Sequence, residues 1–326
     1  MKRTRIILAA VALMTLTGAA GIAPPRHPYA VVHGWPDMPE GRVLGQGAGV
    51  AVDSHGTVFV FHRAGRTWRE PMKLDPIDKP TIAMFDGKSG HLLREWGAGI
   101  FALPHGITID AHDNVWMTDV ALNQVFKFDP QGKLLFVVGE RGVAGKDGSH
   151  FDRPTDIAVL PDGSFYVSDG YRNTRIAKFD ASGHFEFQWG APGKGAGQFD
   201  IPHGLALDAR GHVYVADREN DRVQIFDARG TFLRQWKDPA IGRPYGIALL
   251  KGNRMVIADG GEQPETGPDR SGVAMVDLDG HVLQRFGRFG LYDGQFWGAH
   301  DIATDAAGSV YVVDVDGQRV QKFVAK

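Results

Sequence analysis

Three histidines in this sequence are spaced in a way that suits one shared metal ion. A repeated unit starts at six positions 42 to 56 residues apart, which are Gly49, His105, Thr155, His203, Tyr245 and His300. Histidine occupies every second copy, so a closed six-fold ring would direct three imidazoles at one point on its axis. Three neutral imidazoles with an open fourth position are the ligand set of a catalytic zinc ion, with ligating nitrogens roughly 3.3 Å apart.

The alternative interpretation is that these histidines are polar channel-lining residues that bind water. Histidine makes up 13 of the 326 residues, so an alternating set of three is uncommon by chance. Three converging imidazoles would also repel one another if they were protonated. The pattern therefore favours a metal site.

Two departures from the repeat supply further chemistry. The residue fourteen positions after each start is predicted to end the second strand, and it is aspartate in five copies but Arg63 in the first. Aspartate there is expected to cap a turn, whereas the planar guanidinium group of arginine can bind a carboxylate through two hydrogen bonds. In the third copy Tyr171 follows the aspartate. Taken alone this tyrosine would simply pack, but beside a metal and an arginine its phenol becomes a candidate acid or base, since cationic neighbours lower its pKa.

Short β-strands must position these side chains. Each unit contains three apolar strands separated by turn residues, and segments such as 185–190 and 232–236 supply a fourth. Four short strands per unit are typical of a β-propeller blade. The sixth unit lacks its fourth strand, and we expect segment 31–36 to complete it and close the ring. The predicted fold is all-β, a six-bladed β-propeller, with a solenoid as the competing repeat architecture.

Composition and the first residues limit the classes of function. The 36 basic and 38 acidic residues provide no basic surface for nucleic acid. The absence of cysteine excludes disulfides and thiolate chemistry. Basic residues precede an apolar run from Ile6 to Thr17, followed by small residues, which is the layout of a signal peptide. The predicted organisation is a signal peptide over 1–20, a linker over 21–30 and one propeller over 31–326.

This layout implies a secreted or periplasmic protein that is free of the membrane after cleavage. The alternative for the N-terminal segment is an uncleaved membrane anchor, because the apolar stretch is near the lower limit for spanning a bilayer. Nothing in the sequence indicates assembly, so we expect a monomer.

Several motifs together resemble one enzyme family. They are His105–Asp110, Thr118–Lys127, Ser168–Tyr171, Pro202–His203 and Ala216–Asn220. They are similar to the peptidyl-α-hydroxyglycine α-amidating lyase, the second catalytic unit of the peptide-amidating enzyme. The resemblance spans all six repeats, is more specific than that of generic NHL repeats, and implies a propeller of NHL-like blades.

The resemblance also implies roles for single residues. His105, His203 and His300 match three zinc ligands, Arg63 matches an arginine that grips the substrate, and Tyr171 matches a tyrosine proposed as the general base. The implied reaction cleaves the carbinolamide of an α-hydroxyglycine into an amide and glyoxylate. Its substrate would be a small molecule or a peptide.

A second metal site is implied in the channel. Asp301 matches a carboxylate that binds a structural calcium ion together with the carbonyls of Val50 and Ile107, and such oxygen ligands suit a hard cation. The sequence also departs from the animal members of the family. Arg172 stands where they carry a cysteine, and Gly298 replaces a methionine.

Two other functions fit the repeats. A non-catalytic NHL-repeat propeller would bind peptide or glycan across one face, but it leaves the alternating histidines unexplained. A calcium-dependent lactonase shares the six-bladed form but needs several acidic and amide ligands at the channel. Histidine, threonine, tyrosine and glycine stand at the start positions instead.

Overall fold

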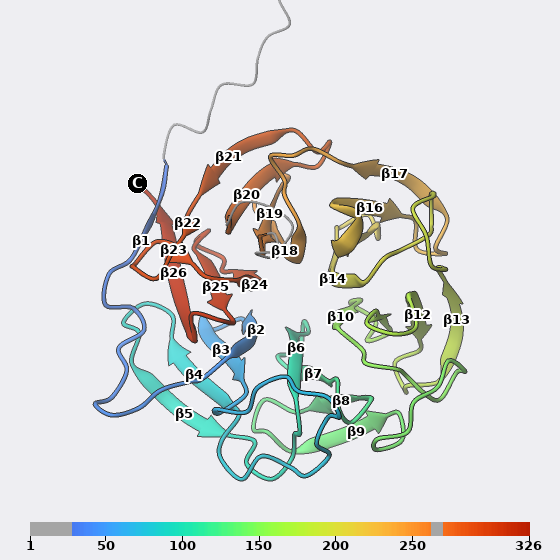
Figure 1. Ribbon diagram of the computed structural model, residues 1–326, viewed down its shortest axis with the longest axis horizontal. Coiled ribbons are helices and arrows are strands. Elements are labelled where there is room, and N and C mark those ends of the chain that lie inside the picture. The colour runs from blue at the N-terminus through green and yellow to red at the C-terminus, as the bar shows by residue number, and fades with distance from the viewer. Residues whose placement is uncertain (1–27, 262–269) are drawn as a thin grey trace, which may run out of the picture.

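Six four-stranded antiparallel sheets surround a central axis in the computed structural model, which describes residues 28–261 and 270–326 (Figure 1). Each sheet is one blade of a β-propeller, as the repeats predict. The predicted signal peptide and most of the predicted linker lie outside the described residues and stay predictions. Within the described part of the chain, no helix has the length and apolar character needed to cross a membrane.

The first three blades follow one another along the chain. Blade one contains β2 (Gly47–Val52), β3 (Thr57–His62), β4 (Ile82–Asp86) and β5 (Leu92–Trp96). Blade two contains β6 (Pro104–Ile109), β7 (Val115–Asp119), β8 (Gln124–Phe128) and β9 (Leu134–Val138). Blade three contains β10 (Asp156–Val159), β11 (Phe165–Asp169), β12 (Arg175–Phe179) and β13 (Phe185–Trp189).

The remaining blades complete the ring. Blade four contains β14 (Pro202–Leu207), β15 (Val213–Asp217), β16 (Arg222–Phe226) and β17 (Phe232–Trp236), with a short 3₁₀ helix, η1 (Arg218–Asn220), after β15. Blade five contains β18 (Pro244–Leu250), β19 (Arg254–Asp259), β20 (Gly272–Asp277) and β21 (Val282–Phe286). Blade six contains β24 (Ala299–Thr304), β25 (Val310–Asp314) and β26 (Arg319–Ala325), and a small parallel pair, β22 (Arg288–Phe289) and β23 (Gln295–Phe296), precedes it.

The N-terminal strand closes the ring, as predicted. β1 (Tyr29–Val31) pairs with β26 and becomes the outermost strand of blade six. It overlaps the predicted segment 31–36 only at Val31. This pairing covers the outer edge of β26 and gives blade six the fourth strand that the other blades have.

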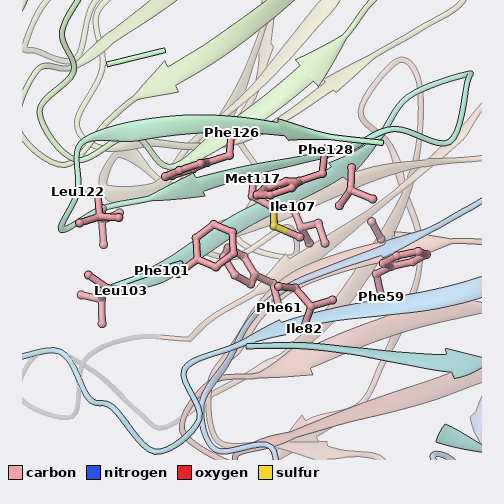
Figure 2. Close-up of a cluster of buried hydrophobic side chains, with 14 of the residues drawn as sticks. Phe59, Phe61, Ile82, Phe101, Leu103, Ile107, Met117, Leu122, Phe126 and Phe128 are labelled. Carbon is pink, nitrogen blue, oxygen red and sulfur yellow. The ribbon is translucent and has the colours of Figure 1, made fainter. Parts of the chain in front are cut away.

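The sequence pattern of each strand follows its place in the blade. The second strand is packed between neighbouring blades on both faces, so all five residues of β15 are buried and four of them are apolar. The outer strand faces solvent on one side, and β13 alternates accordingly. Figure 2 shows the core between blades one and two, where Phe61 packs against Phe101, and Phe101 against Phe126 and Phe128.

The aspartates that end the second strands are structural, as the sequence indicates. Asp119 Oδ2 accepts hydrogen bonds from the main-chain N–H groups of Ala102 and Leu103, at 2.6 and 2.8 Å. Asp169 forms a buried ion pair with Arg175, with 2.8 Å between Oδ2 and Nε. The contacts of Asp119 fix the segment that leads into β6, which is one of the first strands that carry the candidate site.

Candidate active site

The three histidines converge at one end of the channel. β6, β14 and β24 are first strands and lie nearest the axis (Figure 1), and they carry His105, His203 and His300. The three ring centroids are 4.8 to 4.9 Å apart, and all three side chains are buried. One potential ligand atom of each histidine lies within 4.8 Å of those of the other two. This limit is compatible with the roughly 3.3 Å between the ligating nitrogens of a tetrahedral zinc site.

Main-chain carbonyls of the odd-numbered blades orient the histidines. Each Nδ1 lies within hydrogen-bond distance of a main-chain carbonyl oxygen near the beginning of the first strand of the next blade. The pairs are His105 with Thr155 at 2.7 Å, His203 with Tyr245 at 3.2 Å and His300 with Ala48 at 2.7 Å. Because a carbonyl only accepts, Nδ1 must carry the proton, which leaves Nε2 of each neutral ring with a free lone pair. Such hydrogen bonds are how proteins fix the tautomer of a metal-ligating histidine.

Burial keeps the three imidazoles neutral. Desolvation lowers the pKa of His300 to about 3, with the nearby Arg63 as a further cause. Desolvation also holds the pKa of His105 and of His203 well below the usual range, and the neighbouring histidines add to this. The rings are therefore unprotonated at neutral pH, as metal ligation requires. The donor set fits a zinc ion.

Strand pairing moves the start of the first repeat by one residue. In blades two, four and six the residue before the histidine pairs with the aspartate that ends the second strand. In blade one the corresponding pair is Gly47 with His62. The residue equivalent to the histidines is therefore Ala48, and the prediction of Gly49 is wrong by one position. The β-bulge between Gly47 and Gly49 does not cause this offset, because blades two, four, five and six have the same bulge. The second strand of blade one ends in His62 instead of aspartate, so the residue that marks this position in the other blades is missing.

Arg63 consequently follows the second strand of blade one instead of ending it. In blade four the equivalent residue is Arg218, which follows Asp217, so the site has two arginines at matching positions where one was predicted. Both arginines are buried. Arg63 donates from Nε to the carbonyl oxygen of Pro104 (3.2 Å) and from Nη1 to Gln46 Oε1 (2.9 Å).

Tyr171 lies against the histidines. Its Oη is 2.9 Å from His105 Nε2 and 3.3 Å from His203 Nε2, and Arg218 Nη1 donates to the same oxygen at 3.4 Å. Burial raises the pKa of Tyr171, and the charges of Arg218 and Arg63 offset this only in part. The cationic neighbours do lower this pKa, as expected, but desolvation outweighs them and the net shift is upward.

A loop from blade one covers Tyr171. The centroid of the Trp68 ring lies 4.9 Å from that of Tyr171, and the guanidinium carbon of Arg63 lies 5.8 Å from the Trp68 ring. Glu70 of this loop forms an ion pair with Arg153, which precedes the first strand of blade three. The two terminal nitrogens of Arg153 donate to the Glu70 carboxylate at 2.7 and 3.1 Å. The loop thus narrows access to the phenol.

Two carboxylates face the channel beneath the histidines. Asp301 lies in blade six, and Asp156 lies opposite in blade three. Asp301 Oδ2 accepts the main-chain N–H of Val50 at 2.9 Å, and Asp156 Oδ2 accepts that of Leu205 at 2.8 Å. Desolvation raises the pKa of both groups, and the charge of Asp156 adds to the effect on Asp301. Val50 and Ile107 line the same channel, which has a volume of about 320 Å³.

Sequence reasoning missed Arg218 and Asp156. With blade one in its observed register, the position after each start is glycine in four blades and aspartate in the other two, Asp156 and Asp301. Arg218 likewise appears as the partner of Arg63 only in that register. Asp156 leaves a signal in the sequence itself, because it follows Thr155 as Asp301 follows His300, whereas the match of Arg218 with Arg63 requires the strand pairing of blade one.

Comparison with known proteins finds NHL repeats and relatives that match most of this chain. NHL repeats match residues 151–179, 199–226 and 296–323. Peptidyl-alpha-hydroxyglycine alpha-amidating lyase 2 of Drosophila melanogaster is 33% identical over 319 residues, which cover 90% of this chain and 75% of the fly protein. The NHL repeat-containing protein 3 of Homo sapiens is 31% identical over 324 residues, with 91% and 84% covered.

Other relatives are much longer than this chain. The peptidylglycine alpha-amidating monooxygenase of Rattus norvegicus is 37% identical over 305 residues, which are 86% of this chain but only 30% of the rat protein. A streptogramin B lyase structure superposes with a TM-score of 0.57 at 14% identity, covering 91% of this chain and 98% of that one. At that identity the likeness concerns the fold alone.

Proposed function

This chain belongs to the peptidyl-alpha-hydroxyglycine alpha-amidating lyase family, and we propose that it is a zinc-dependent lyase that cleaves an α-hydroxyglycine carbinolamide into an amide and glyoxylate. One observation carries the proposal. Three neutral imidazoles, the Tyr171 phenol and two buried arginines meet at the same end of the channel. The substrate class follows from the names of the relatives.

Zinc is proposed as the metal held by Nε2 of His105, His203 and His300. Zinc in such a site supplies Lewis-acid polarisation of an oxygen and thereby lowers the pKa of a hydroxyl group. The hydrogen bonds at Nδ1 hold the three rings in the orientation that ligation needs. Binding of the substrate and transfer of the proton would be carried out by side chains of this chain.

Arg63 and Arg218 would orient the substrate through its carboxylate. A guanidinium group pairs with a carboxylate through two parallel hydrogen bonds, which fix both position and angle. The two arginines follow equivalent strands three blades apart, and both lie near the phenol of Tyr171, whose pKa their charges lower. A carboxylate held there would place the adjacent hydroxyl-bearing carbon beside the histidines.

Tyr171 would transfer the proton. Its Oη would accept the proton of the substrate hydroxyl and donate its own proton to the amide nitrogen as the carbon–nitrogen bond breaks. The bonding electrons go to that nitrogen, the hydroxyl oxygen becomes the aldehyde oxygen of glyoxylate, and the phenol is regenerated. A phenol that remains neutral throughout is consistent with its raised pKa. Trp68 would keep water away from this exchange.

The direct test is the release of glyoxylate from α-hydroxyhippurate by zinc-loaded protein, with benzamide as the second product. We expect equal amounts of both products, and none from hippurate, which lacks the hydroxyl group. A working member of the family serves as the positive control. If that control turns over and this protein does not, the lyase proposal fails and a non-catalytic propeller that binds peptide or glycan takes its place.

Calcium is proposed as a second, structural ion between Asp301 and Asp156. Two carboxylates whose negative charges repel each other would be stabilised by a divalent cation, and oxygen ligands suit calcium. The carbonyls of Val50 and Ile107, which line the channel, would complete the set.

We expect calcium at saturating concentration to raise the melting temperature by about 5–10 °C over protein treated with EGTA. The Asp301→Asn variant should lose most of this shift. An equivalent carboxylate far from the channel, Asp293→Asn, provides the matched control and should keep it. Thermal unfolding followed by circular dichroism gives the measurement, and an equal calcium effect in all three proteins would contradict the site.

A further inference from the structure

Tyr245 occupies the start position of blade five, between two of the histidines. Its ring centroid is 5.1 Å from that of His203 and 5.7 Å from that of His300. Tyr171 approaches from the other side of His203, with ring centroids 5.3 Å from His105 and 5.8 Å from His203. Two phenol rings therefore flank His203.

The guanidinium group of Arg218 lies against both of these rings. Its Cζ atom is 4.7 Å from the Tyr245 centroid and 5.3 Å from the Tyr171 centroid. A cation within about 6 Å of an aromatic face is attracted by the ring quadrupole, and more strongly where water is excluded. Arg218 also donates from Nε to Glu219 at 2.9 Å, and Arg243 donates to the same carboxylate. Arg218 is thus held by the Tyr245 ring beside its guanidinium group and by Glu219 at its Nε.

We propose that Tyr245 is a positioning residue whose ring face, rather than its hydroxyl, holds Arg218 in place to bind the substrate carboxylate. The proposal rests on the proposed function for the role of Arg218. The proposal gives the two tyrosines different roles, because their side chains contact the site through different groups. Tyr171 Oη lies within hydrogen-bond distance of imidazole nitrogens, whereas the side chain of Tyr245 contacts His203, His300 and Arg218 through its ring.

A flexible arginine explains why such support matters. An arginine side chain loses considerable rotamer freedom when it is fixed, so a side chain that is already ordered binds its ligand at lower entropic cost. Without the Tyr245 ring, Arg218 would keep its hydrogen bonds to Glu219 and Tyr171 but lose the nearer of the two aromatic rings against which it lies. Carboxylate affinity is therefore expected to fall, while the histidines remain in place.

The test measures binding instead of turnover. Hippurate carries the carboxylate but no hydroxyl group, and calorimetry gives its Kd for the wild type, Tyr245→Phe and Tyr245→Leu. We expect Tyr245→Leu to weaken hippurate about tenfold and Tyr245→Phe to remain within about twofold of the wild type. Hippuramide, in which an amide replaces the carboxylate, should bind all three proteins with similar Kd.

A double-mutant cycle with Arg218→Ala then shows whether Tyr245 acts through the arginine. In the Arg218→Ala background, Tyr245→Leu should have little further effect on hippurate binding. Equal losses in Tyr245→Phe and Tyr245→Leu, additive losses in the double variant, or no hippurate binding by the wild type would each overturn the proposal. A wild type that binds hippurate with this pattern but releases no glyoxylate from α-hydroxyhippurate would refute the lyase function alone.

Discussion

Replacing Tyr171 with phenylalanine is expected to lower kcat for α-hydroxyhippurate by about 10²–10⁴-fold, the range for loss of a general acid–base group. The ring of Tyr171 would still pack against Trp68 and the imidazoles, so the fold should be unaffected. Only the oxygen that faces His105 and His203 is removed. Arg63 and Arg218 remain, and KM should therefore change far less than kcat.

The measurement compares kcat and KM for Tyr171→Phe and for Tyr292→Phe. Tyr292 is 80% exposed and carries the same phenol outside the site, which makes it a matched control. Zinc content and melting temperature are recorded for both variants. If Tyr171→Phe kept full kcat with normal zinc content, the phenol would have no part in proton transfer.

Replacing His203 with alanine is expected to abolish stoichiometric zinc binding and the lyase activity together. A three-histidine site that loses one ligand keeps only two nitrogens, and even the loss of a residue that merely supports a ligand costs about 10–100-fold in metal affinity. We therefore expect zinc affinity to fall by at least ~100-fold. The blade itself should remain folded, because the strand partners of β14 on either side of the bulge are unaffected.

Metal analysis of the purified variant, with circular dichroism and glyoxylate release, tests this expectation. His184→Ala makes the same substitution at a turn where the side chain is 82% exposed, and it should retain zinc and activity. Zinc retained at one ion per chain in His203→Ala would show that the imidazoles do not form the metal site. Loss of zinc together with unfolding would place His203 in the structural core instead.

The repeat could be recognised in the sequence because each unit corresponds to one blade, whose strands are close together along the chain. Strand pairing within a blade joins residues close in sequence, as in Val213 with Phe226, so the apolar strands and the turns between them recur at a regular spacing. The alternation of histidine with other residues depends only on that spacing and on ring closure. The spacing follows from the repeats themselves. Ring closure follows from the last repeat, which lacks a fourth strand that the N-terminal segment can supply.

The sequence by itself therefore determined the six-bladed ring, its closure by the N-terminal strand and the meeting of His105, His203 and His300. Only the tertiary structure revealed the strand pairing that makes Ala48 the first start position, the equivalent positions of Arg63 and Arg218, and the raised pKa of Tyr171. The physical reason is that these features depend on contacts between blades. The hydrogen bond between His300 and Ala48 joins residues 252 positions apart, and the burial of a phenol depends on the Trp68 loop that covers it, neither of which leaves a periodic trace in the chain.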